Sequence, residues 1–214
     1  MFSRDVVDSA DVGQTNSIKL FDFSPSIQGK IIWIDKRTVE FKPENRLTSG
    51  KRYEARFMLS RLFNNLPKEL ATFEYSFQIT PQNFEVYIQN IKSYLKAHLK
   101  KQKIEGVLNT ADYAELRLVE KTVDAVQEGK TLRVTWTHTG DGLHHGFTVE
   151  DVMKNDAAGK INITVNGQAF GIDRIENEVV DIPSIDDFKL INTRVVETPN
   201  QHLVLQFSDP LKEN

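Results

Sequence analysis

The stretch RYEARFML, residues 52–59, alternates polar and apolar side chains along most of its length. Tyr53, Ala55, Phe57 and Leu59 fall on one side of an extended chain, and the charged side chains between them fall on the other. Successive side chains of a strand point to opposite faces of a sheet. The pattern therefore predicts a strand with one buried face and one exposed face.

The same alternation extends outward through the first 80 residues. Residues 38–43 (TVEFKP) and 73–79 (FEYSFQI) repeat it, and short turn-forming stretches such as residues 49–51 (SGK) separate the predicted strands. Strands at this spacing are typical of an antiparallel sandwich with immunoglobulin-like topology. With a boundary expected at residues 79–83 (ITPQN), residues 1–81 are predicted to form one such sandwich that lacks its first strand.

Residues 82–186 are predicted to form a second β-sandwich with one inserted helix. Strands are expected around residues 84–88, 95–100, 104–108, 132–136, 147–149 and 161–165. Between them the period changes, because Leu116, Val119, Val123 and Val126 recur at helical spacing. This spacing predicts a helix near residues 115–127.

A short phrase occurs near both ends of the chain, as residues 2–6 (FSRDV) and residues 207–211 (FSDPL). Each copy is typical of a strand that runs into a turn, and residues 201–207 (QHLVLQF) are the predicted strand of the second copy. We expect residues 187–214 to be the first strands of a following, truncated module of a tandem array. The tail strand is expected to pair with the second module or to fill the vacant edge of the first module in a neighbouring copy.

Composition excludes several classes of function. The 214 residues are 39% hydrophobic and 27% charged with a net charge of −3, so no global positive field attracts nucleic acid. No apolar run reaches the roughly 18 residues of a spanning helix, and no membrane insertion is expected. The absence of cysteine removes disulfides, thiolate metal sites and cysteine nucleophiles. With no hydrolase or phosphate-loop motif, we expect no enzymatic activity, no catalytic residues and no cofactor.

Histidines supply the strongest candidate for a metal site. His138, Asp141, His144 and His145 lie within eight residues between Trp136 and Phe147. Two glycines and an aspartate at this place favour a hairpin loop, and adjacent histidines on an extended chain point to opposite sides. The loop interpretation is preferred, and no metal is expected.

Two other residue sets have a functional and a structural interpretation. A basic stretch, which comprises Lys92, Lys96, Lys100, Lys101 and Lys103, lacks the interleaved aromatic residues of a nucleic-acid patch. Lysines that protect an edge strand from aggregation are the preferred interpretation. Trp33 and Trp136 lie in predicted strands among apolar residues, which favours a buried core position over an exposed sugar-binding platform.

Several of these stretches together resemble a known family. Residues 23–29 (FSPSIQG), Trp33, residues 37–43 (RTVEFKP) and residues 47–53 (LTSGKRY) resemble a bacterial immunoglobulin-like module. The following module, with residues 110–112 (TAD) and 119–121 (VEK), resembles the amino-terminal macroglobulin-like region of the bacterial, Bacteroidetes-type alpha-2-macroglobulins. The resemblance covers nearly the whole chain.

The resemblance implies a non-catalytic scaffold role in a large protein that traps proteases. That parent protein is expected in the cell envelope, in the periplasm or outside the cell, and could be a lipoprotein. Its partners would be other domains of the same parent chain and the target proteases. Members of the family often carry a Cys-Gln thioester and a bait region, and neither matches any position here, so no functional residue is carried over. The alternative is a stalk or binding module of a bacterial cell-surface adhesin, and an accessory module of a carbohydrate enzyme is a third.

Overall fold

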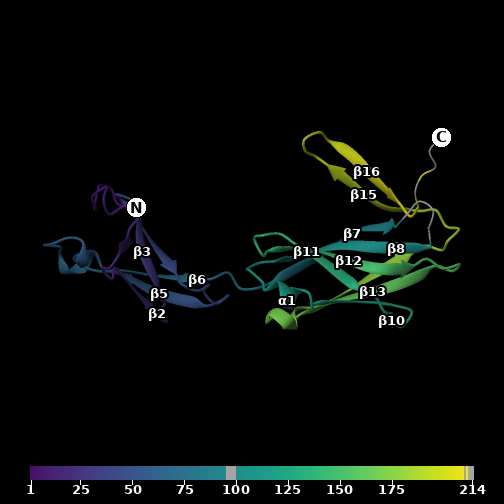
Figure 1. Cartoon of the computed structure of the whole chain (residues 1–214), viewed down its shortest axis with the longest axis horizontal. Coiled ribbons are helices and arrows are strands. Elements are labelled where there is room, and N and C mark those ends of the chain that lie inside the picture. The colour runs from purple at the N-terminus through teal and green to yellow at the C-terminus, as the bar shows by residue number, and fades with distance from the viewer. Residues whose placement is uncertain (95–99, 210, 212–214) are drawn as a thin grey trace. The chain divides into compact units, whose positions relative to one another are not determined.

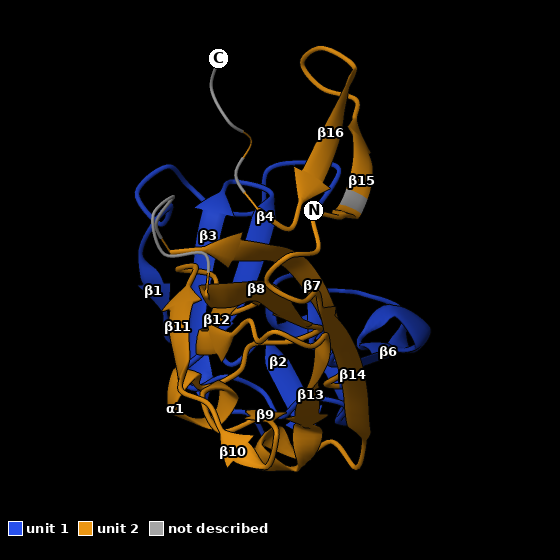
Figure 2. Ribbon diagram, turned by 90° about the vertical axis from the view of Figure 1, so that its right-hand side faces the viewer, with its two compact units in different colours: residues 1–81 blue, residues 82–214 orange. Residues whose placement is uncertain are grey.

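The computed structural model describes residues 1–94, 100–209 and 211, and strands make up half of the chain (Figure 1). Helical segments account for 7%. The prediction of an all-β fold with one short helix is confirmed. The strands belong to two compact units, Met1–Pro81 and Gln82–Asn214, which Figure 2 colours blue and orange.

Unit 1 contains two three-stranded antiparallel sheets. The first has the order β1-β3-β4 and comprises β1 (Thr15–Asn16), β3 (Gly29–Asp35) and β4 (Thr38–Pro43). The second has the order β2-β5-β6 and comprises β2 (Phe21–Ser24), β5 (Arg52–Phe57) and β6 (Phe73–Gln78). Two 3-10 turns, η1 (Leu59–Arg61) and η2 (Lys68–Leu70), lie between β5 and β6.

Aromatic side chains join the two sheets of unit 1. The ring of Phe41 on β4 lies 4.6 Å from that of Phe23 and 5.8 Å from that of Phe21, both on β2. Trp33 on β3 is fully buried, and the ring of Phe2 packs 6.0 Å from it. These contacts follow from the alternation in the sequence, because each strand turns its apolar residues toward the opposite sheet.

Unit 2 contains two four-stranded antiparallel sheets and a separate hairpin. The first sheet, of order β11-β12-β8-β7, comprises β7 (Phe84–Ser93), β8 (Lys101–Thr110), β11 (Val134–His138) and β12 (His144–Met153). The second, of order β10-β9-β13-β14, comprises β9 (Val123–Gln127), β10 (Lys130–Thr131), β13 (Gly159–Asn166) and β14 (Ile175–Ile182). The hairpin comprises β15 (Leu190–Val196) and β16 (His202–Phe207), and the remaining segments are α1 (Leu116–Val119) and η3 (Gly167–Phe170).

The core of unit 2 lies between its two four-stranded sheets. Ile104, Leu108 and Phe147 belong to one sheet, Ile161 and Ile163 to the other, and none of these five is more than 2% exposed. Gly106 sits opposite Phe147 in the β8–β12 ladder, and a Cβ at this position would lie 2.2 Å from the Phe147 ring. The glycine therefore makes room for the ring, which explains a glycine in the middle of a central strand.

The prediction of a helix near residues 115–127 was wrong in its length. Helix α1 has only four residues, and Val123–Gln127 forms strand β9. Val123, Ala125 and Gln127 are buried, which is the alternation of a strand, and β9 pairs with β13. Of the four positions at helical spacing, only Val123 lies on the buried side of this strand, and pairing with β13 decided for a strand over a helix. Of the strand predicted at residues 95–100, residues 95–99 lie outside the described part of the chain.

The two tryptophans differ in burial. Trp33 is buried as predicted, whereas the prediction for Trp136 was wrong because its side chain is only half-buried. Trp136 points toward the core opposite Phe147, but it belongs to β11, the edge strand of its sheet. An edge position leaves one side of an inward-facing ring uncovered.

Replacement of the two tryptophans provides a test of this difference. We expect Trp33→Ala to lower the free energy of unfolding of unit 1 by about 3–5 kcal/mol, because it leaves a large cavity in a small core. Trp136→Ala should lower that of unit 2 by less, since part of the ring is already in contact with water. Urea denaturation followed by circular dichroism measures both values, and equal losses would contradict the assigned burial.

Candidate interaction site

The histidine-rich segment forms the β11–β12 hairpin, as the loop interpretation predicted, with the turn at residues 139–143 and the histidines at the strand ends. His138 pairs with His145 across the hairpin, and their Nδ1 atoms lie 2.9 Å apart. His144 points to the other side of the strand, where its Nδ1 lies 2.7 Å from Asp141 Oδ2. Glu120 Oε1 lies 3.2 Å from His138 Nε2. Among the residues that the structure describes, no group of His, Asp and Glu has the arrangement of a metal site.

His145 is fully buried on the core side of β12, and its Nε2 has no hydrogen-bond partner among the described residues. Burial, and then the proximity of His138, lower the pKa of His145 below its ordinary value. The ring is therefore neutral in the folded protein near neutral pH. The exposed Asp141 carboxylate has a lowered pKa because it accepts hydrogen bonds from the Thr139 hydroxyl, the Leu143 amide and His144.

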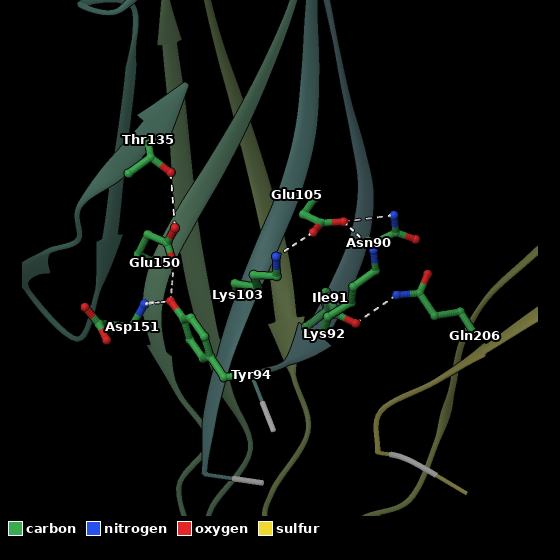
Figure 3. Close-up of polar contacts among 10 residues, drawn as sticks. All are labelled: Asn90, Ile91, Lys92, Tyr94, Lys103, Glu105, Thr135, Glu150, Asp151 and Gln206. Carbon is green, nitrogen blue, oxygen red and sulfur yellow. Dashed lines mark hydrogen bonds and ion pairs between the residues drawn. The ribbon is translucent and has the colours of Figure 1, made fainter. Parts of the chain in front are cut away.

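The basic stretch divides between an edge strand and an inner strand. Lys92 lies on the edge strand β7, as the protective interpretation expects, but Lys101 and Lys103 lie on the inner strand β8. Glu105 accepts from Lys92 Nζ at 2.6 Å and lies 2.8 Å from Lys103 Nζ (Figure 3). Partial burial opposes ionisation, but these two lysines outweigh it and lower the pKa of Glu105 to about 2. Lys96 lies outside the described residues.

A β-bulge lies beside this cluster. The β8–β12 ladder shifts register between Val149 and Val152, and Asp151 adopts a left-handed backbone with φ of 56°. The hydroxyl of Tyr94 accepts from the Asp151 amide at 3.0 Å and donates to the Glu150 carboxylate (Figure 3). A bulge leaves an unpaired backbone group, and the Tyr94 hydroxyl satisfies it here. Burial, and then the hydrogen bond to Glu150, raise the pKa of Tyr94.

The strand predicted at residues 201–207 exists as β16, but within the described part of its own chain it does not pair with a sheet of the second module. Pairing with a neighbouring copy stays a prediction. β16 pairs with β15 in a two-stranded sheet, with Val195 opposite Leu203 and Thr193 opposite Leu205. Within the described residues, it does not join either sheet of the second sandwich. The tail segment supplies its own pairing partner, because residues 190–196 form the strand β15 that precedes β16 in the chain.

A buried ion pair holds this hairpin against the sandwich. Lys154 directly follows β12, and Asp209 is the second residue after β16. The Lys154 Nζ atom lies 2.6 Å from Asp209 Oδ2. The Lys154 side chain is 0% exposed and that of Asp209 is 11% exposed. A lysine loses much hydration free energy on burial, so this geometry requires its carboxylate partner.

Ser208 completes the attachment between the ion pair and the hairpin. Its carbonyl accepts from Gln102 Nε2 at 3.0 Å, and its hydroxyl donates to Asp209 Oδ2 at 2.7 Å. The Lys189 amide donates to the same hydroxyl at 2.9 Å. We call Gln102, Lys154, Ser208 and Asp209 the hairpin anchor. Because Gln102 lies on the core side of β8, the anchor ties the end of the hairpin to the interior of unit 2.

A further contact lies outside the anchor. Gln206 Nε2 on β16 donates to the carbonyl oxygen of Ile91 on β7 at 2.8 Å (Figure 3). Residues 90–93 and 204–209 line an open cleft of about 370 Å³ between these two strands. Since a peptide carbonyl and an amide are neutral, this contact fixes position without adding charge.

One face of the hairpin is apolar and exposed. Leu190, Val195, Leu203 and Leu205 share this face through the pairing of β15 with β16, and each is 46–59% exposed. We call these four residues the hairpin's apolar face. A two-stranded sheet with an uncovered apolar face is only marginally stable alone, so attachment on its other side is essential. The hairpin therefore combines an anchored end with an exposed apolar face.

The sequence pointed to part of this site. The second copy of the repeated phrase contains Ser208 and Asp209, which belong to the anchor, whereas Pro210 lies outside the described residues. Gln102 and Lys154 were missed, because a single polar residue beside an apolar strand gives no sign of burial. Among the described residues, no helix has the length and hydrophobicity needed to cross a bilayer.

Comparison with known protein families and with curated proteins found no match to this sequence. The fold defines the chain as an all-β protein of antiparallel sandwich units.

We expect Lys154→Ala to release the hairpin from unit 2. Removal of one partner leaves the Asp209 carboxylate without its cation in a buried place, and the free energy of the hairpin attachment should fall by about 3–5 kcal/mol. Hydrogen exchange of the β15 and β16 amides measures the release. The double change Lys154→Met with Asp209→Leu should retain more protection than the single change. Lys101→Ala is the control, since its pair with Asp151 is exposed.

The buried histidine predicts a pH dependence of stability. Below the ordinary histidine pKa of 6.5, the unfolded chain binds a proton that buried His145 resists, so the free energy of unfolding should fall as the pH falls. The facing groups are His138, His144, Asp141 and, through His138, Glu120. Urea denaturation between about pH 5 and pH 8 should give a smaller slope for His145→Phe than for the wild type. Exposed His144→Gln is the control, and an unchanged slope for His145→Phe would contradict the assignment.

Proposed function

We propose that this chain is a non-catalytic scaffold segment of a macroglobulin-like, protease-trapping protein, and that it acts through domain–domain and protein–protein contacts. The observation that supports this proposal best is the anchored hairpin. Lys154 and Asp209 set the direction in which β15 and β16 leave the sandwich, and the hairpin's apolar face remains open for another protein layer. A scaffold needs both properties, because it must transmit an orientation from one module to the next.

The sequence resemblance supports the same function from a different direction. Residues 23–29, 37–43 and 47–53 resemble the immunoglobulin-like modules of that family, and the order of modules follows its amino-terminal region. The parent protein would reside in the cell envelope, in the periplasm or outside the cell. Its other domains would contact this segment directly, and its target proteases would be captured by regions elsewhere in the parent.

The second candidate is a stalk or binding module of a bacterial surface adhesin. Exposed apolar and aromatic side chains such as Tyr87 on β7 and Leu203 on β16 favour it, because a binding module presents such groups to a ligand. In that case the isolated chain would itself bind a glycan or a host protein.

A protease-trapping assay with the parent protein tests the proposal. A trapped protease should keep its activity on a small chromogenic peptide and lose most of its activity on a large protein substrate, because the closed trap excludes only the latter. The 214-residue chain alone should change neither activity. Lys154→Ala in the parent should weaken the protection, since the following modules would lose their fixed orientation, and exposed Lys101→Ala should not.

A different pattern of protease activity and ligand binding would favour the adhesin. The trap hypothesis would be contradicted if the protease kept its activity on both substrates in the presence of the parent protein. Glycan binding by the isolated chain on an array would then favour the adhesin.

A further inference from the structure

Strand β6 of unit 1 has one free edge. It pairs with β5 along one side, and no strand of residues 1–81, all of which the structure describes, pairs with the other side. A free strand edge presents unpaired backbone N–H and C=O groups, which another extended strand can satisfy. The partner that fits such an edge is therefore an extended peptide strand and not a helix or a small molecule.

The core-facing side of β6 is exposed. Phe73 lies opposite the buried Phe57, and Tyr75 lies opposite the buried Ala55, so both rings are on the inner face of the sheet. Phe73 is nevertheless 60% exposed and Tyr75 is 38% exposed. Inner-face aromatic residues are exposed only where the opposite layer does not reach them. The free edge and the uncovered rings belong to the same strand.

A groove runs along these rings. Phe2, Phe21, Val39, Phe57, Phe73 and Tyr75 line a groove of about 350 Å³ at the mouth between the two sheets of unit 1. We call it the acceptor groove. Its lining is almost entirely apolar and aromatic, so it favours a strand that turns apolar side chains inward at every second position.

The chain itself carries a strand with this chemistry. β16 has six residues, as β6 has, and its Leu203, Leu205 and Phe207 alternate on one face. Leu203 and Leu205 belong to the hairpin's apolar face, and β16 pairs only with β15 within the described residues. One protein thus presents an open acceptor and an exposed donor of equal length.

We propose that the acceptor groove of one copy binds strand β16 of a second copy by strand addition at β6. The exposed Leu203 and Leu205 extend the aromatic row of Phe73 and Tyr75 into the groove. The two surfaces of this contact are different, so it is heterologous, and each bound copy still presents one free groove and one free strand. Association therefore continues beyond the dimer. This inference does not depend on the proposed scaffold function.

Two substitutions test the two sides of the contact separately. Phe73→Lys places a charge in the acceptor groove, and Leu205→Lys places one on the donor strand. Both side chains are largely exposed, so neither change disturbs a core, and the thermal unfolding profiles should match the wild type. Sedimentation of the full chain over a concentration series should show a rising mass for the wild type and a monomer for each variant.

Mixing the two variants distinguishes this contact from nonspecific hydrophobic association. The Phe73→Lys chain keeps its donor strand and the Leu205→Lys chain keeps its groove, so an equal mixture should form a heterodimer and stop there. Val179→Lys is the matched control, because Val179 is 55% exposed on the edge strand β14 and lies outside both surfaces. It should associate as the wild type does.

Three results would overturn the inference. They are a wild-type chain that stays monomeric up to its highest attainable concentration, association that survives either substitution, and a mixture of the two variants that remains monomeric. Hydrogen exchange gives a second measurement, since β6 amides at residues 73–78 should gain protection on association in the wild type and lose that gain in Leu205→Lys.

Discussion

Every antiparallel sheet in this chain has an apolar face, and the need to cover that face with a second layer organises the whole structure. In unit 1 the contacts of Phe41 with Phe21 and Phe23 meet this need across the two sheets. In unit 2 the ring of Phe147 meets it, in the space that Gly106 leaves open. Where the second layer ends, apolar residues become exposed. The exposed rings of Phe73 and Tyr75 on β6 and the hairpin's apolar face both follow from this single constraint.

In the hairpin, polar contacts fix an orientation that apolar packing alone would not determine. Hydrophobic contacts are non-directional, so they would tolerate several orientations of a two-stranded sheet on a sandwich. The buried pair of Lys154 and Asp209 has one favourable geometry, and Gln102 adds a second point of attachment through Ser208. A buried ion pair contributes little net stability compared with an apolar replacement. Removal of only one of its two charged partners, however, strongly lowers the free energy of unfolding. The ion pair therefore fixes the orientation of the hairpin more than it adds to the free energy of unfolding.

Sequence reasoning succeeded where a residue's environment follows from its neighbours along the chain. The strands of residues 52–57 and 73–78 were predictable because alternation is a local property, and the histidine turn was predictable from its glycines and aspartate. The helix prediction near residues 115–127 failed beyond Val119, since Val123, Ala125 and Gln127 satisfy a strand once β13 is available to pair with them. Pairing with a strand some 40 residues away is not visible in a local period.

The sequence by itself determined that the chain is all-β, that it has no cysteine chemistry and that the phrase around Ser208 ends a strand, because these properties depend on composition and on alternation. Only the tertiary structure decided that Lys154 and Gln102 are buried, that Trp136 lies at an uncovered edge and that Phe73 faces the core side yet meets solvent. Burial depends on which distant strand lies opposite a side chain and on where each sheet ends. Both are set by packing between segments that are far apart in the chain.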